Sequence, residues 1–242
     1  MKVHAMPVVR LSTPADLERT AVPQVDSEPP VLISISGQTG AGKSTILNGI
    51  ADFLQRHRSD VAIVDEKALH HPYLDRYFHD PDRFGFELQL RFMLDRVILV
   101  ERWLTAGFSV VMERSHLEDP VFIRTLRAMS YVTNDEFDLY MGLWTRLNDR
   151  VRPPNALVFL DVASSISQAR LAGRVDQTTP GHLVFPDEKT QRRWIDSWHQ
   201  QYQRRFAEIA ADARYGDKLL RHTPGVTVDT ITQDIARVVK LD

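Results

Sequence analysis

Residues 37–44, Gly-Gln-Thr-Gly-Ala-Gly-Lys-Ser, match the pattern G-x-x-x-x-G-K-[ST]. Residues 31–36 before the motif are apolar and mostly β-branched, and residues 43–57 after it carry apolar side chains at helical spacing. A glycine-rich turn between a strand and a helix points successive backbone N–H groups and the positive end of the helix at phosphate groups. In this setting Lys43 supplies a positive charge and the Ser44 hydroxyl ligates Mg²⁺. We therefore expect the chain to bind ATP and Mg²⁺.

The phosphate groups of ATP are expected to contact the whole turn and the first residues of the following helix. These residues are Gly37, Gln38, Thr39, Gly40, Ala41, Gly42, Lys43, Ser44 and Thr45.

Acidic side chains follow two further apolar segments that are typical of buried strands. Residues 61–64 lead to Glu66, and residues 108–112 lead to Glu113 and Arg114. Because the carboxyl ends of adjacent parallel strands open on one crevice, we expect these three side chains to converge beside the glycine-rich turn. A carboxylate placed there can accept the proton of an attacking hydroxyl, and an arginine can offset charge on a phosphoryl group in transfer. Taken singly, either glutamate could instead be a solvated residue at a strand end.

Composition and missing motifs exclude several classes of protein. The 30 basic and 32 acidic residues give a net charge of −2, which argues against a dedicated binder of nucleic acid or of an anionic membrane. The absence of cysteine excludes disulfides, thiolate zinc sites and cysteine nucleophiles. Guanine-binding switch proteins carry an N-K-x-D motif and a D-x-x-G motif after the third strand, and neither is present at these places. With no long apolar run for a membrane span or a signal peptide, we expect a cytoplasmic protein.

The order of apolar segments predicts an α/β fold. Strands are expected at residues 31–36, 61–64, 108–112, 156–160 and 226–228, separated by helices at about 43–57, 84–105, 117–130, 134–150, 164–172 and 187–214, with a closing helix at 231–240. This alternation indicates a doubly wound, five-stranded parallel sheet with helices on both faces. The proline-rich residues 1–30 are expected to form a flexible arm, and residues 31–242 a single domain.

Beyond the glycine-rich turn, the chain resembles the deoxynucleoside kinase family over about residues 31–206. Residues 78–89, Phe-His-Asp-Pro-Asp-Arg-Phe-Gly-Phe-Glu-Leu-Gln, are similar to the family segment Tyr-x-x-Pro-x-Arg-Trp-x-Phe-x-x-Gln. Residues 113–119 are similar to its Glu-Arg-Ser-x-x-x-Asp. The resemblance implies that Glu66 is the catalytic base and that Lys43 and Arg114 act on the phosphates. It also makes Glu113, with Ser44, a direct or indirect contact of the metal.

The resemblance further implies a nucleobase pocket formed by Gln89, Arg96 and Asp119. An amide, a guanidinium and a carboxylate together suit a base edge with an exocyclic amine beside a ring acceptor, as in adenine and cytosine, and they can accommodate guanine. Thymine would place a carbonyl against a buried carboxylate, at a cost of about 1–3 kcal/mol. Without the resemblance, Gln89 and Arg96 could simply be a polar stripe on an amphipathic helix, and Asp119 a charge at a helix N-terminus.

Other parts of the resemblance concern the lid and the sugar. The family closes an arginine-bearing lid over the phosphates, which implies a lid at about residues 170–186 with Arg170 and Arg174 contacting ATP. Asp176 lies near the place of a sugar-contacting acid. Phe78 stands where the family has a tyrosine that binds the sugar, and we expect the adjacent Tyr77 to point elsewhere. His71 stands where the family usually has a tryptophan. These departures leave a ribonucleoside or a modified nucleoside open as substrate.

The sequence thus predicts a kinase that transfers the γ-phosphoryl group of ATP to the 5′-hydroxyl of a nucleoside or deoxynucleoside. We expect no nucleic-acid or membrane partner, and the resemblance implies a homodimer. One alternative is a kinase of a nucleoside monophosphate or of another hydroxylated metabolite. Another is a nucleotide-binding regulator that transfers nothing.

Overall fold

A parallel sheet of six strands forms the centre of the molecule in the computed structural model, which describes residues 9–11, 13, 15–16, 29–58, 60–69, 74–172, 185 and 187–241. The strands are β1 (Val9–Leu11), β2 (Leu32–Ser36), β3 (Val61–Val64), β4 (Ser109–Glu113), β5 (Ala156–Leu160) and β6 (Leu219–His222). Their order across the sheet is β1-β3-β4-β2-β5-β6, and every neighbouring pair is parallel. The carboxyl ends of β2, β3 and β4 therefore lie side by side.

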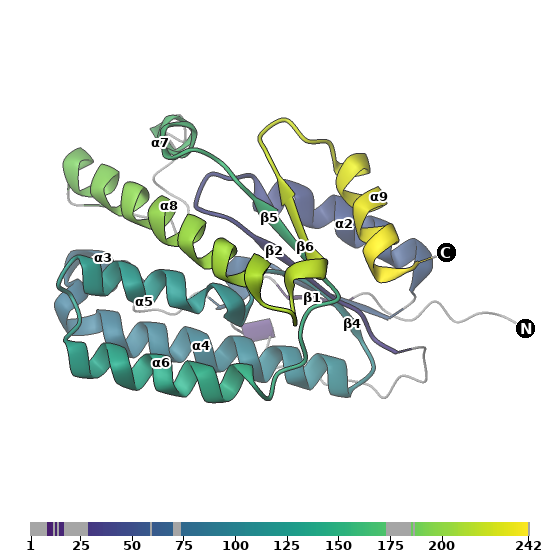
Figure 1. Cartoon of the computed structure of the whole chain (residues 1–242), viewed down its shortest axis with the longest axis horizontal. Helices are drawn as coiled ribbons and strands as arrows, with labels where there is room; N and C mark the ends of the chain where they lie inside the picture. Colours follow the sequence, from purple (N-terminus) through teal and green to yellow (C-terminus); the bar gives the residue numbers. More distant parts are fainter. Residues whose placement is uncertain are drawn as a thin grey trace, which may run out of the picture.

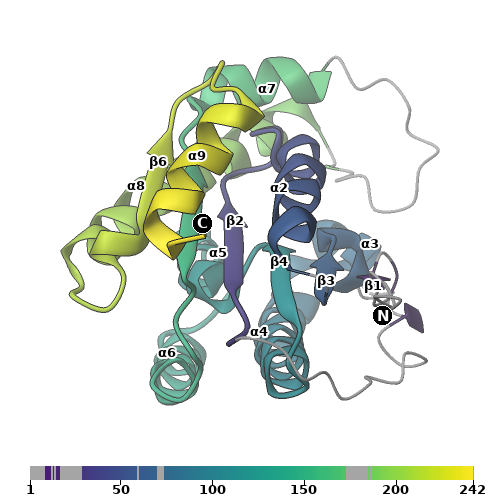
Figure 2. The ribbon, with the colours of Figure 1, turned by 90° about the vertical axis from the view of Figure 1, so that its right-hand side faces the viewer.

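Helices cover both faces of the sheet (Figures 1 and 2). One face carries α2 (Lys43–His57) and α9 (Val228–Val239), and the other carries α4 (Pro81–Thr105), α5 (Asp119–Ala128), α6 (Asn134–Asn148) and α8 (Glu188–Ala211). Two shorter helices, α3 (Leu74–His79) and α7 (Ser164–Ala172), lie toward the carboxyl edge of the strands.

Alternation along the strands divides the apolar core between these two faces. Ile33, Val111 and Val158 pack with α2 and α9, whereas Leu32, Val110 and Leu157 pack on the opposite side with α4, α5 and α8. Because the side chains of a strand alternate in direction, continuous apolar strands are expected wherever both faces of a sheet are covered. The predicted fold class is therefore confirmed, with one more strand than expected.

Strand β1 comes from the segment that we expected to be a flexible arm. Residues 9–11 pair with β3 at the edge of the sheet, and Leu11 is completely buried. A strand of three residues is too short to show alternation in the sequence, so composition alone gave no sign of it.

The prediction of a strand at residues 226–228 is wrong. The last strand is β6, and residues 226–228 lead into α9, whose N-cap Thr227 accepts a hydrogen bond from the Thr230 backbone N–H. At the edge of the sheet β6 has only one fully buried residue, so its apolar pattern is weak. Val228 is apolar for another reason, since it packs against Gly49 of α2.

The boundaries of the expected helices agree with the observed ones to within three residues. The helix expected at 43–57 is confirmed at both ends. The long helix begins three residues earlier than expected, at Pro81, because Asp80 caps it by accepting a hydrogen bond from the Arg83 backbone N–H. In the described part of the chain, no helix has the length and hydropathy needed to span a membrane.

The place of β1 in the sheet can be tested by core truncation. We expect Leu11→Ala to lower the free energy of unfolding by about 2–4 kcal/mol, because it removes a fully buried side chain. Arg10→Ala, on the exposed neighbour in the same strand, should change it by less than about 0.5 kcal/mol. Urea denaturation monitored by tryptophan fluorescence measures both. Equal, small effects would mean that residues 9–11 do not belong to the folded sheet.

Candidate active site

The glycine-rich turn connects β2 to α2 with a backbone that requires glycine. Gly37, Gly40 and Gly42 all have positive φ values, of 144°, 80° and 99°. At Gly37 a β-carbon would also lie 2.9 Å from the Leu160 carbonyl oxygen on the adjacent strand β5. The turn therefore fits tightly against the end of β5, and α2 begins directly after it with Lys43. Such a turn leaves the helix N-terminus open to anions.

Three charged side chains from separate elements meet beside this turn. The Lys43 ammonium Nζ lies 3.7 Å from Glu66 Oε2, and Arg114 Nε donates a hydrogen bond of 2.5 Å to Glu66 Oε1. Lys43 begins α2, Glu66 follows β3 and Arg114 follows β4. The structure thus brings together the residues that the strand order predicts to converge. Glu66 is the most exposed of the three, with a third of its side chain accessible.

The backbone of Arg114 has an unusual conformation that directs its side chain toward Glu66. Its φ of 57° lies in the left-handed region, which non-glycine residues adopt at a cost of about 1 kcal/mol. Its backbone N–H still donates to the Ile35 carbonyl oxygen on β2, at 3.0 Å. The arginine therefore leaves the sheet ladder immediately after its last hydrogen bond and turns toward Glu66.

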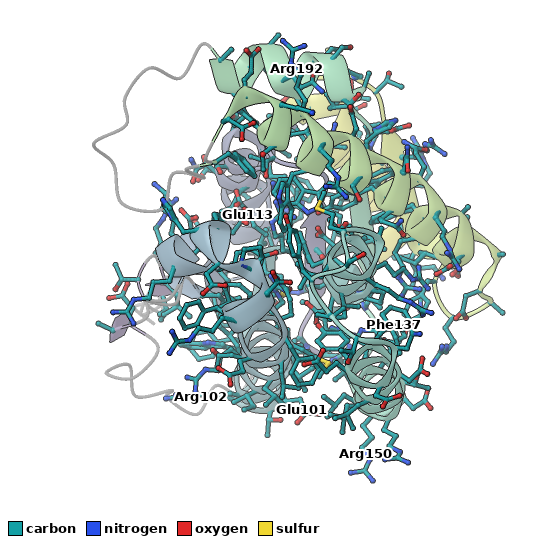
Figure 3. The ribbon with its side chains drawn as sticks, turned by 90° about the vertical axis from the view of Figure 1, so that its left-hand side faces the viewer. Glu101, Arg102, Glu113, Phe137, Arg150 and Arg192 are labelled. Carbon is teal, nitrogen blue, oxygen red and sulfur yellow. The ribbon has the colours of Figure 1, made fainter. Side chains whose placement is uncertain are left out.

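A buried carboxylate and a hydroxyl lie behind Lys43. Glu113 is 1% exposed and hydrogen-bonds with the Ser44 side chain, and its Oε1 has no partner among the described residues. Burial raises the pKa of Glu113, while the nearby Lys43 lowers it. Figure 3 shows Glu113 inside the molecule, in contrast to Glu101 at its surface.

These two oxygen donors fit Mg²⁺, which prefers oxygen ligands and usually keeps several waters and substrate phosphate oxygens. The described residues contain no group of three or more His, Asp or Glu side chains that could hold a metal alone. A magnesium ion here would therefore be shared between the Ser44–Glu113 pair and the phosphates of the nucleotide.

Lys43 is a buried cation with charges of both signs nearby. Burial lowers the pKa of Lys43, and the positive Arg114 lowers it further, whereas Glu66 and Glu113 raise it. A phosphate group on the turn would act in the same direction as the two carboxylates and favour the charged form of Lys43.

A cavity of about 550 Å³, part of it open to solvent, begins at Glu66 and Arg114 and extends toward α3 and α4. Its walls are mainly apolar and aromatic, with a few polar groups, and consist of Thr39, Glu66, Leu69, Leu74, Tyr77, Phe78, Gln89, Phe92, Arg96, Arg114, Phe122 and Trp198.

Gln89 and Arg96 are the polar residues at the far end of this cavity. Both lie on α4, at positions that share one helix face. The Gln89 side chain hydrogen-bonds with the Tyr77 hydroxyl, and its Oε1 has no partner among the described residues. We expected Tyr77 to point away from the site. It instead lines the cavity beside Phe78.

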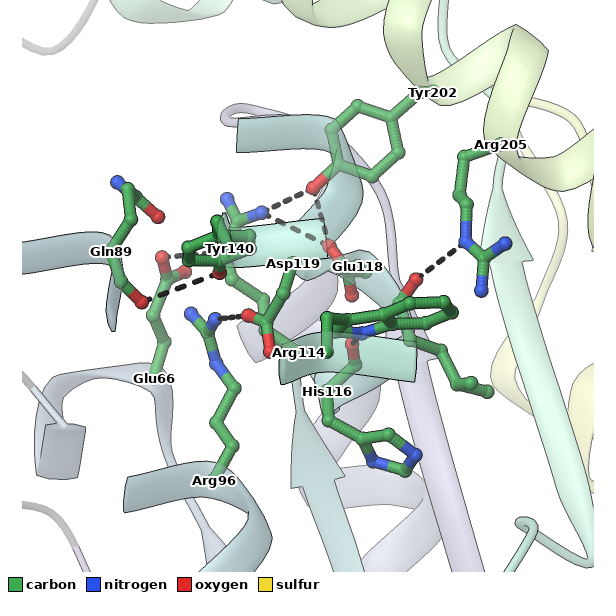
Figure 4. A network of polar contacts seen from close by, with 12 residues as sticks. Glu66, Gln89, Arg96, Arg114, His116, Glu118, Asp119, Tyr140, Tyr202 and Arg205 are labelled. Carbon is green, nitrogen blue, oxygen red and sulfur yellow. Dashed lines mark hydrogen bonds and ion pairs between the residues drawn. The ribbon is translucent and has the colours of Figure 1, made fainter. Parts of the chain in front are cut away.

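Asp119 lies behind Arg96 and does not line the cavity. It is completely buried and forms an ion pair with Arg96, which is 4% exposed. Burial raises the pKa of Asp119 to about 7, although Arg96 acts in the opposite direction. Figure 4 shows the two side chains facing each other. In this structure Asp119 therefore fixes Arg96, and Arg96 faces the cavity.

Several lining residues were not identified from the sequence. Phe122 is the most informative, because its ring lies between two guanidinium groups, 5.8 Å from that of Arg96 and 5.0 Å from that of Arg114. Its position one helical turn after Asp119 could have indicated it. Trp198 gave no such signal, because its stripe on α8 is typical of a helix that packs on the core.

A second cavity, of about 830 Å³ including its open part, lies on the other side of the turn. It is bounded by Gly40, Ala41, Gly42, Thr45, Ile46, Leu160, Val162, Arg170, His222, Thr223, Pro224, Gly225, Val226 and Val228. Arg170, from α7, donates a hydrogen bond of 2.8 Å to the Gly40 carbonyl oxygen. Of the other residues expected near the phosphates and the sugar, Arg174, Asp176 and His71 lie outside the described residues, as does most of the expected lid.

Comparison with known proteins identifies the family and the fold of the chain. The family model for deoxynucleoside kinase matches residues 33–232. A deoxyadenosine kinase of Dictyostelium discoideum is 24% identical over 165 residues, which cover 68% of this chain and 63% of that protein. A deoxyadenosine/deoxycytidine kinase of Bacillus subtilis is 24% identical over 174 residues, which cover 69% of this chain and 78% of that protein. The structure of deoxyadenosine kinase from M. mycoides with bound dCTP superposes with a TM-score of 0.65 at 19% identity, covering 87% of this chain and 99% of that chain, which shows a shared fold.

The pairing of Asp119 with Arg96 can be tested by comparison with a more exposed ion pair, Arg91–Asp95, on α4, the helix of Arg96. At pH 8, Asp119→Ala should lower the free energy of unfolding by about 3–5 kcal/mol, because Arg96 would remain buried without a counter-charge. Asp95→Ala removes the partner of Arg91, which is 59% exposed, and should cost at most about 1 kcal/mol. Urea denaturation gives both values, and equal costs would contradict the buried pair.

Proposed function

The chain belongs to the deoxynucleoside kinase family, and we propose that it transfers the γ-phosphoryl group of ATP to the 5′-hydroxyl of a nucleoside. Members of this family are phosphotransferases that act on nucleosides. The observation that carries the proposal is the position of Glu66, which contacts Lys43 of the glycine-rich turn and Arg114, and also lines the cavity of about 550 Å³. A donor held by the turn and an acceptor held in the cavity would meet at this carboxylate.

Glu66 is the proposed general base. The 5′-oxygen of the nucleoside attacks the γ-phosphorus, its proton passes to a Glu66 oxygen, and the bond between the γ-phosphorus and the bridging oxygen of ADP breaks. Lys43 and the N–H groups of the turn hold the phosphates, and Arg114 offsets charge on the phosphoryl group during transfer. Ser44 and Glu113 would hold Mg²⁺, which neutralises charge on the phosphate oxygens.

The donor is proposed to extend from the turn into the second cavity. Residues 223–226 and Val228 would surround its base there, and Arg170 lies at the phosphate end, hydrogen-bonded to the Gly40 carbonyl oxygen. Arg174 is proposed to contact the same phosphates. Asp176 is proposed to contact the sugar of the nucleoside acceptor. Phe78 has no hydroxyl with which to bind that sugar and would contact it through its ring.

The acceptor base is proposed to be adenine, cytosine or guanine rather than thymine. Gln89 Oε1 lacks a partner among the described residues, and an exocyclic amine would satisfy it while a ring acceptor receives a hydrogen bond from Arg96. Thymine would leave such a buried acceptor unpaired, at a cost of about 1–3 kcal/mol. Both cations of the cavity wall, Arg96 and Arg114, already pair with carboxylates, which suits a neutral nucleoside better than a nucleoside monophosphate. We further propose, on the family resemblance, a homodimer that acts in nucleoside salvage, and, from the sequence pattern, a cytoplasmic location.

Release of ADP, coupled to a spectroscopic assay, tests the function over a panel of nucleosides, deoxynucleosides and their monophosphates. Release stimulated by deoxyadenosine, deoxycytidine or deoxyguanosine above that by thymidine supports the proposal. Stimulation by monophosphates only would indicate a monophosphate kinase. Tight binding of ATP without stimulated release by any acceptor would indicate a nucleotide-binding regulator.

The role of Glu66 is tested by Glu66→Gln. The amide keeps the shape of the side chain but cannot take up the proton, so we expect kcat to fall by a factor of about 10²–10⁴. Affinity for ATP should change less than about twofold, since the turn and Lys43 remain. Glu101→Gln, on the exposed surface of α4, serves as the control and should leave kcat unchanged. Near-normal turnover of the Glu66 variant would show that another group is the base.

A further inference from the structure

We propose that Glu118 and Tyr202 are positioning residues that hold the guanidinium of Arg114 in the orientation required for phosphoryl transfer. The inference rests on the proposed function and adds two residues that do not themselves line the cavity. Glu118 lies just before α5, whereas Tyr202 comes from α8, 84 residues later in the chain. Both side chains are buried, with exposures of 0% and 2%.

The three side chains form a closed set of hydrogen bonds (Figure 4). Arg114 Nη1 donates to Glu118 Oε2 at 3.1 Å and also to the Tyr202 hydroxyl oxygen. The Tyr202 hydroxyl donates in turn to Glu118 Oε2. Each partner thus restrains the other two, and the restraint acts on the side of the guanidinium that faces away from the cavity.

The bonds leave one part of the guanidinium available. A guanidinium has five N–H donors in a fixed plane. Nε donates to Glu66, and Nη1 donates to Glu118 and Tyr202. No hydrogen bond among the described residues uses Nη2, and Arg114 lines the cavity beside Glu66. Because the plane is rigid, fixing Nε and Nη1 also fixes Nη2, which is the group left to contact a phosphoryl oxygen.

The two residues also balance the charge around the proposed base. With Glu66 as its single carboxylate partner, Arg114 would have no other anion to offset its buried positive charge. Glu118, fully buried and 3.1 Å from Arg114, shares that positive charge. Tyr202 supplies the hydroxyl that Glu118 Oε2 needs as a second donor, without adding charge. The Arg114 backbone, at a φ of 57°, requires such restraint, since a left-handed non-glycine residue persists where its surroundings hold it.

Steady-state kinetics of Tyr202→Phe test the inference most directly. The substitution keeps the ring, which stacks on Phe159 and Phe206, and removes only the hydroxyl. We expect kcat to fall about tenfold, while the KM for the nucleoside and the Kd for a non-hydrolysable ATP analogue change less than about twofold, because the lost restraint acts on transfer and not on binding. Glu118→Gln is the second variant and should show the same division between kcat and KM.

Two controls separate positioning from loss of stability. Tyr215→Phe also removes a buried hydroxyl that hydrogen-bonds with a side chain, that of Asn148 at 3.2 Å, and should leave kcat unchanged. The double variant Tyr202→Phe/Glu118→Gln should be about as slow as the slower single variant, since both residues act through Arg114. Thermal denaturation shows that each variant is folded under the assay conditions.

The outcomes distinguish this inference from the function on which it rests. A wild-type chain that releases no ADP with any nucleoside overturns the proposed function and the inference with it. A wild-type chain that turns over normally, with Tyr202→Phe or Glu118→Gln equally fast, overturns the inference alone. Equal losses in Tyr202→Phe and Tyr215→Phe, or multiplied losses in the double variant, also contradict it, because they indicate a general effect on the fold.

Discussion

The arrangement of this site depends on an arginine that is buried between two carboxylates. Arg114 is 3% exposed and hydrogen-bonds directly with Glu66 and Glu118. A buried guanidinium is costly unless its donors are paired, and removing a single partner leaves an uncompensated charge. The pairing therefore constrains several elements at once: the loop after β3, the segment before α5 and the middle of α8 must all remain in place around one side chain.

The parallel sheet makes this pairing possible. With β3, β4 and β2 adjacent, the residues that follow them leave the sheet at one edge, next to the turn that begins α2. Lys43 and Arg114 then approach Glu66 from two sides, and the cavity opens on the third. The same edge would receive both substrates of the proposed reaction, so that donor and acceptor come together at Glu66, which remains partly exposed.

Much of this could be predicted from the sequence, and the exceptions have physical reasons. The turn at residues 37–44, the helix at 43–57 and the convergence of Glu66 with Arg114 follow from local motifs and from the rule that parallel strands end together. Glu118 and Tyr202 could not be identified in that way. A buried hydrogen bond between residues 84 positions apart leaves no local pattern, and the spacing of Tyr202 on α8 is the spacing of an ordinary core residue. Similarly, β1 and β6 lie at the edges of the sheet, where short strands carry little alternation.

The most direct measurement is a crystal structure of the chain with a deoxynucleoside and a non-hydrolysable ATP analogue. The account predicts the 5′-oxygen of the nucleoside within about 3.2 Å of a Glu66 oxygen, with Lys43 on the phosphates of the analogue and Arg114 Nη2 directed at its terminal phosphate. A nucleoside bound with its 5′-oxygen remote from Glu66, or a triphosphate held away from residues 37–44, would contradict it.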